Sequence, residues 1–135
     1  MNTKKYIKNS PRLPLIVAPI SHAVVTGNYC HTSGQLSWDK SGNFISGTVL
    51  KEAKLAFKNL FAVLKEANFA KDDIVFLDIA FKNLAHLEII TPFYQSLFEE
   101  SKQPARTIYQ VSELPYGAKI KILAIAIRLE NQTNS

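Results

Sequence analysis

The hydrophobic pattern of this chain changes its period near residue 48, and this change does most to limit the folds available to it. Before it, residues 22–36 predict a hairpin: an apolar run, a turn at Thr26–Gly27–Asn28 and a second strand. After Thr48, apolar residues recur at steps of three and four, with lysines and glutamates between them. These apolar residues are Val49, Leu50, Ala53, Phe57, Leu60, Phe61 and Leu64. The spacing predicts an amphipathic helix of about five turns, capped by the Thr48 hydroxyl group.

Further segments complete the predicted order of elements. Residues 13–20 favour an extended strand at the start of the domain, and the β-branched and aromatic run at 73–82 favours a strand covered on both faces. The pair Thr91–Pro92 favours the start of a second helix, because proline at the first helical position loses no useful N–H group. Residues 105–111 and 119–129 predict the last two strands.

The predicted order is strand, hairpin, helix, strand, helix, strand, strand, which is typical of an α+β domain with both helices on one face of a mixed sheet. The chain has 135 residues, 47% of them apolar, so we expect a single domain over residues 1–135 with tails at 1–12 and 131–135. The last strand is apolar at both parities from Ile122 to Ile127. Because a one-layer sheet leaves one face uncovered, we expect subunits to associate there into a closed oligomer.

Charge and composition limit the possible partners. The net charge of +5 permits attraction to anions, but the basic residues are dispersed and no interleaving of basic and aromatic residues is present, so we do not expect nucleic acid as the primary ligand. No apolar run approaches the roughly 20 residues of a membrane span, so we expect no membrane partner. The single cysteine, Cys30, rules out an intrachain disulfide and suits a reducing cytoplasm. We expect Cys30 to be a small buried apolar residue rather than a nucleophile.

We also expect neither a cofactor nor a metal. The glycine-rich nucleotide-binding motifs and the His-Glu-x-x-His motif are absent. His22, His31 and His86 lie on different predicted elements, whereas a metal site needs at least three convergent ligands.

Two short stretches are candidates for a binding site. Thr32–Ser33–Gly34–Gln35 forms a polar end to an apolar strand, where backbone N–H groups can face a ligand; an ordinary strand end or bulge explains it equally well. Pro104–Ala105–Arg106–Thr107 places an arginine at the start of an otherwise apolar strand, where a burial cost applies unless it is exposed or paired. Composition by itself favours a surface arginine there.

Taken in order, these motifs resemble the Rid family, also called YjgF or L-PSP, the reactive enamine/imine deaminases. The resemblance covers about residues 13–128. The matching segments are Thr26–Gly27–Asn28, Thr32–Ser33–Gly34–Gln35, Asp73–Ile74–Val75, Lys82–Asn83–Leu84, Tyr94, Pro104–Ala105–Arg106, Leu114–Pro115, Lys119–Ile120 and Ala124–Ile125–Ala126.

The resemblance implies a homotrimer of chorismate-mutase-like domains, with sheets inside, helices outside and ligand clefts between subunits. It implies that Arg106 holds the carboxylate of a small substrate, which suits a planar guanidinium group that makes two parallel bonds. It also implies that the Ser33–Gly34 segment, through a backbone N–H at Gly34, helps to hold this carboxylate. The implied reaction is attack of water on the C=N carbon of a 2-imino acid, which releases ammonia and a 2-oxo acid.

The chain departs from the family pattern at three candidate site positions. Ile20 stands where deaminating members have a tyrosine, Ile108 where they have a cysteine, and Lys121 where they have a water-activating glutamate. We keep all three in the candidate substrate site, with Arg106 and Lys121 as its candidate catalytic residues. If the strand face that carries Arg106 meets the face of the last strand that carries Lys121, the two cations share one cleft.

Two functions therefore stay open. The first is an imine deaminase that acts on a small carboxylate, with its proton relay rebuilt from Lys121, His22 or bound water. The second is a binding protein that holds a dianionic carboxylate between Arg106 and Lys121 without turning it over. A ribonuclease or translation-inhibitor activity has only the basic charge in its favour.

Overall fold

The hairpin and the first helix form where the sequence predicts them. Strands β2 (Ala23–Thr26) and β3 (Tyr29–Thr32) pair antiparallel through a turn in which Gly27 has a φ of +57°. Glycine adopts this left-handed conformation without steric penalty. Helix α1 (Val49–Glu66) follows Thr48, whose side-chain oxygen accepts the backbone N–H three residues later at 3.2 Å. Both local expectations are confirmed.

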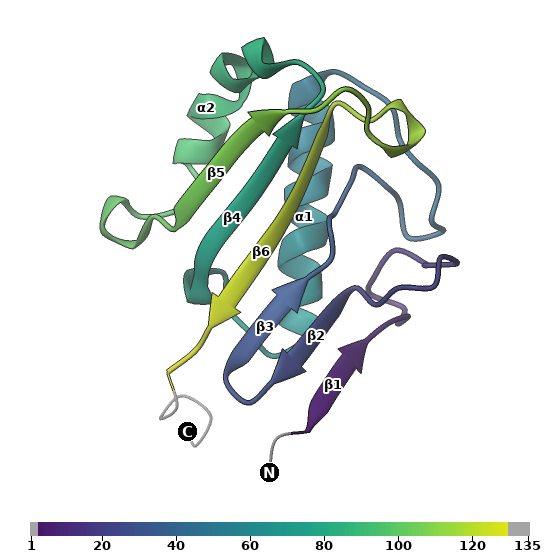
Figure 1. Cartoon of the computed structure of the whole chain (residues 1–135), viewed down its shortest axis with the longest axis vertical. Helices are drawn as coiled ribbons and strands as arrows, with labels where there is room; N and C mark the ends of the chain where they lie inside the picture. The colour runs from purple at the N-terminus through teal and green to yellow at the C-terminus, as the bar shows by residue number, and fades with distance from the viewer. Residues whose placement is uncertain (1–2, 130–135) are drawn as a thin grey trace.

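Six strands form one mixed sheet in the computed structural model, which describes residues 3–129 (Figure 1). The strand order is β1-β2-β3-β6-β4-β5. The strands not yet given bounds are β1 (Lys4–Ile7), β4 (Ile74–Phe81), β5 (Ala105–Gln110) and β6 (Ile120–Ile127). Strands β4 and β5 run parallel, and the other neighbours are antiparallel. The final strand therefore lies in the interior of the sheet, between β3 and β4.

Both helices cover the same face of the sheet, which confirms the predicted α+β class. Figure 1 shows α1 and α2 (Leu87–Gln95) together behind the strands. Alternate residues of β6 point toward them and are buried, and they share one apolar core with α1. Full burial of one large apolar side chain contributes about 1.5–3 kcal/mol, so this layer holds the sheet and helices together. Lys121, Leu123 and Ile125, between these buried residues, lie on the opposite face of β6 and are half-buried.

The N-terminal segment differs from the prediction. Residues 13–20 form no strand, whereas β1 lies inside the expected tail at 1–12 and pairs with β2, with Ile7 opposite Ala23. Pro14 and Pro19 lack the N–H groups that a strand interior uses, which keeps residues 13–20 out of the sheet. Strand β1 pairs with the outer edge of β2 instead. The second expected tail, 131–135, lies outside the described residues.

The second helix also begins earlier than predicted. Helix α2 starts at Leu87, so Thr91–Pro92 lies inside it and not at its start. The missing N–H of Pro92 removes one helical hydrogen bond. The Thr91 hydroxyl group donates to the Leu87 carbonyl at 2.8 Å, which satisfies an acceptor in the same turn. The predicted start was wrong because a Thr–Pro pair can also lie inside a short helix.

We predict that the Cys30 thiol is unreactive in the folded protein. Its side chain is fully buried, as the sequence suggests, and burial raises the pKa of Cys30 to about 11. Only about one thiol in a thousand is then ionised at pH 8, and the thiolate is the reactive form. A chromogenic aromatic disulfide should label the native chain at least roughly 100-fold more slowly than the chain in urea. Equal labelling rates would contradict the buried position.

Candidate functional site

Four of the six predicted site residues lie together at the end of β3. Ile20, Ser33 and Gly34 line one cavity, and the stem of Lys121 packs directly on Gly34. A Cβ atom placed on Gly34 would lie 2.8 Å from Lys121 Cδ and 3.0 Å from Lys121 Cγ. Glycine at position 34 is therefore what allows the lysine to lie here.

The backbone N–H of Gly34 is a free donor. The N–H groups on either side of it are engaged, because Ser33 donates to the His22 carbonyl at 2.8 Å and Gln35 donates to the Ile122 carbonyl at 2.6 Å. Within residues 3–129, the Gly34 N–H has no partner. The Ser33 hydroxyl group donates to the Ser21 carbonyl at 2.5 Å and holds this segment against residue 21. An anion can therefore accept a hydrogen bond from Gly34.

Lys121 adds a positive charge beside that donor. It lies on the face of β6 that points away from the helices, opposite Ala80 of β4, and it is half-buried. None of the acidic groups in the described part of the chain forms an ion pair with it. A half-buried cation without an acidic partner favours an anionic ligand or an acidic neighbouring surface.

Arg106 lies in a separate cleft on the other side of the sheet. Its guanidinium carbon is 4.7 Å from the ring centre of Tyr94, which is a cation–π contact. The cleft measures about 290 Å³ and lies between α2 and the start of β5. Its other lining residues are Thr91, Gln95, Gln103 and Pro104. Burial raises the pKa of Tyr94 and the Arg106 charge opposes that rise, so the phenol stays neutral at physiological pH.

Arg106 and Lys121 do not share a cleft within one chain. Strand β5 pairs with β4 rather than with β6, and Arg106 lies opposite Leu77, whose other partner is Ala124 on the helix-covered face. Lys121 lies on the reverse face. Ile108 also lies on the helix-covered face, where it packs half-buried against the core. The alternation of side chains along a strand does not reveal the order of strands in the sheet.

His22 is held as a neutral structural residue. Its Nε2 lies 2.7 Å from the Pro14 carbonyl oxygen, and its Nδ1 lies 3.2 Å from the side-chain nitrogen of Gln35. Burial lowers the pKa of His22, and the hydrogen bond to Pro14 only partly offsets this effect. Both ring nitrogens are engaged, so His22 has no free lone pair for the proton relay that the sequence allowed.

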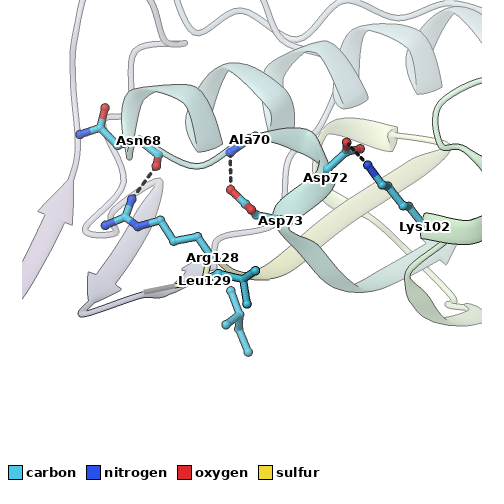
Figure 2. Close-up of a pocket in the computed structure, with 8 residues that line it drawn as sticks. Asn68, Ala70, Asp72, Asp73, Lys102, Arg128 and Leu129 are labelled. Carbon is cyan, nitrogen blue, oxygen red and sulfur yellow. Dashed lines mark hydrogen bonds and ion pairs between the residues drawn. The ribbon is translucent and has the colours of Figure 1, made fainter. Parts of the chain in front are cut away.

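A larger hollow at the other end of the sheet contains none of the predicted site residues. Figure 2 shows this pocket of about 810 Å³, where α1 ends and β6 leaves the sheet. Its charged groups bind one another or the backbone: Lys102 to Asp72 at 3.3 Å, Asp73 to the Ala70 N–H at 2.7 Å, and Arg128 to the Asn68 carbonyl at 2.5 Å. Its polar groups are therefore already largely satisfied, and we do not take it as the site.

Residues 3–129 contain neither a metal-binding cluster nor a membrane-spanning helix. No three His, Cys, Asp or Glu side chains in this range gather closely enough to hold a metal ion. No helix in it has the length and apolar character needed to cross a bilayer.

Comparison with known proteins agrees with this architecture. The family model for endoribonuclease L-PSP matches residues 12–128. The chain is 34% identical over 121 residues to human 2-iminobutanoate/2-iminopropanoate deaminase, covering 89% of this chain and 88% of that protein. The fold, two helices on one face of a mixed six-stranded sheet, is that of the YjgF/L-PSP proteins.

Solved structures support the same assignment. The YjgF gene product from E. coli matches with a TM-score of 0.83 and 30% identity, over 93% of this chain and 99% of that one. The Rid family protein YyfA from Yersinia pestis matches with a TM-score of 0.86 and 28% identity, over 93% of this chain and all of that one. The chain belongs to the Rid (YjgF/L-PSP) family.

We predict that His22 makes the stability of the protein depend on pH. Its folded pKa lies below the unfolded value of about 6.5, so the unfolded chain binds more protons as the pH falls through this range. The stabilising contribution is complete above about pH 6.5 and is lost at lower pH. Between pH 7.5 and 5.5, the melting temperature should fall more in the unmodified protein than in His22→Gln.

His31 and His86 are present in both of these proteins, so the difference between the two curves reports His22 alone. Parallel curves would show that protonation of His22 is not resisted by the fold.

Proposed function

We propose that this protein binds the carboxylate of a small 2-imino acid in a cleft between two subunits and hydrolyses the imine. One observation carries the proposal: each chain has two separate positions suited to an anion, on opposite faces of one sheet. Arg106 occupies one position, and the Gly34 N–H with Lys121 occupies the other. A single copy cannot bring both onto one ligand, whereas two copies can place Arg106 of one beside Gly34 of the next.

The uncovered sheet face supports association of copies. A groove of about 720 Å³ crosses it, and its lining includes Ile20, Val24, Ser33 and Leu123. The apolar side chains on this face stay partly exposed in one copy, and contact with another copy would remove them from water. A closed ring of three copies is the assembly we propose, because it covers this face in every subunit.

The chemistry follows from the placement of charge. The two parallel hydrogen bonds of Arg106 orient the substrate carboxylate, and the Gly34 N–H adds a third donor. Water then adds to the C=N carbon, and the imine nitrogen takes up a proton. The hydroxyl proton of this adduct then passes to the amine nitrogen, the C–N bond breaks, and ammonia and the 2-oxo acid are released. The deaminase name of the human relative supports this reaction class. The side chains of Ile20 and Ile108 transfer no protons, which leaves Lys121 and water for that step.

A complementation experiment tests whether the site is shared between chains. Arg106→Ala removes one half, and Gly34→Val displaces Lys121 from the other. Each variant alone should lose at least roughly 100-fold of the 2-iminopropanoate hydrolysis rate, measured by a coupled dehydrogenase assay. After the two are unfolded and refolded together in equal amounts, about one quarter of wild-type activity should return, because about one site in four combines two intact halves.

If both halves belonged to one chain, no mixed assembly would contain an intact site, and the mixture would stay inactive. Each variant refolded alone is the control, and sedimentation equilibrium confirms that each still assembles.

The unpaired charge of Lys121 favours a second candidate function, binding of a dianion without turnover. Removal of one charge-assisted bond weakens binding by about tenfold or more. Calorimetric titration should therefore give tighter binding of oxaloacetate than of pyruvate to the unmodified protein, and Lys121→Met should abolish the difference. Equal affinities for both ligands would leave Lys121 outside the ligand site. A dianion preference without imine hydrolysis would select this function over the first.

A further inference from the structure

A small cavity lies beside Gly34. It measures about 60 Å³, and no Lys, Arg, Asp or Glu side chain lines it. Its lining residues are 15–18, Ile20, His22, 33–35, Trp38, Gly42 and Tyr116. A bound water needs at least about 10–15 Å³ of such space, so the cavity has room for a group of a few heavy atoms. A charged group would lose its hydration here without gaining an opposite charge.

The amide orientation of Gln35 follows from its neighbours. The Pro14 carbonyl can only accept a hydrogen bond, so His22 carries its proton on Nε2 and its Nδ1 is an acceptor. Gln35 must then present its NH₂ group to Nδ1, at 3.2 Å. Its Oε1 is turned away from His22, and this atom is buried without a partner in residues 3–129. Gln35 is 1% exposed, so bulk water does not satisfy the oxygen either.

Trp38 supplies the complementary unpaired group. Its indole Nε1–H is also buried and has no acceptor in the described part of the chain. The ring is held edge-on to Tyr116, with 5.6 Å between ring centres. Tyr116 is 67% exposed, so the cavity borders solvent on this side. One acceptor and one donor therefore stay unfilled among the residues that line this cavity, and leaving such buried groups unpaired is unfavourable.

We propose that this cavity binds an uncharged primary carboxamide group. The amide NH₂ would donate to Gln35 Oε1, and the amide carbonyl would accept from Trp38 Nε1–H. A carboxylate has no donor for Gln35, and a hydrocarbon group leaves both atoms unpaired. Because Gly34 lines the same cavity, a substrate carboxylate at Gly34 would direct its side chain here. This last step rests on the proposed function, and it makes the substrate a 2-imino acid whose side chain ends in a carboxamide.

The test uses ligands that match in shape and differ in polarity. Propanamide, butanone and propanoate are titrated into ¹⁵N-labelled protein while the indole N–H signal is followed by NMR. The chain contains one tryptophan, so the signal belongs to Trp38. Propanamide should shift this signal saturably and bind at least about tenfold more tightly than either of the other two ligands. No shift with propanamide, or equal affinity for all three, would mean that the cavity holds only water.

Variants separate the cavity from the rest of the site. Gln35→Met should weaken propanamide binding by about three- to tenfold, whereas Gln110→Met, which removes an exposed amide on β5, should leave it unchanged. Propanamide has neither a carboxylate for Arg106 nor an imine to hydrolyse, so this measurement fails or succeeds independently of imine hydrolysis. Equal binding by Gln35→Met and the unmodified protein would overturn the proposal. The titration of the unmodified protein remains decisive if Gln35→Met does not fold.

Discussion

The pairing of β6 with the end of the hairpin is the interaction on which the rest of the structure depends. Ile122 exchanges two backbone hydrogen bonds with Gln35, at 2.6 and 3.1 Å. The Ser33 N–H bonds to His22 on the β2 side and the Gln35 N–H bonds to Ile122 of β6, so the Gly34 N–H between them has no strand partner. The exchange also places Lys121 on Gly34, since residues on one face of paired strands lie side by side. Strand β6 also carries buried apolar residues that pack under the helices. The position of this one strand therefore determines both the core and the candidate site.

The single layer of strands explains why the candidate site is divided. Arg106 is on the face that carries the helices, and Lys121 is on the reverse face, with β4 between their strands. No rotamer can carry either group across a hydrogen-bonded sheet. The chain therefore depends on a second copy to complete the site we propose. Assembly and ligand binding would then be linked, because whatever separates the copies also separates the two halves.

Agreement between sequence and structure was best where the signal was local. The 3.6-residue spacing after Thr48 and the glycine turn of the hairpin depend on neighbouring residues alone, and both were confirmed. The predicted start of α2 was wrong because the Thr91 hydroxyl group bonds to a carbonyl inside the helix instead of capping its start. Strand β1 was missed because KKYI has too few apolar residues to stand out, and it is stabilised by pairing with β2. Gln35 and Trp38 carried no sequence signal as a pair, since their unpaired atoms appear only when burial is known.

Sequence alone determined the α+β class, the family and the candidate ligand residues, because hydrophobic period, turn chemistry and ordered motifs are all properties of the chain itself. Tertiary structure alone decided which of those residues meet. The alternation along a strand shows which side chains share a face, but it does not show which strand lies next to it. The insertion of β6 between β3 and β4 brought Lys121 to Gly34 and separated both from Arg106. Strand order depends on burial of the whole sheet, and no single segment of the sequence contains that information.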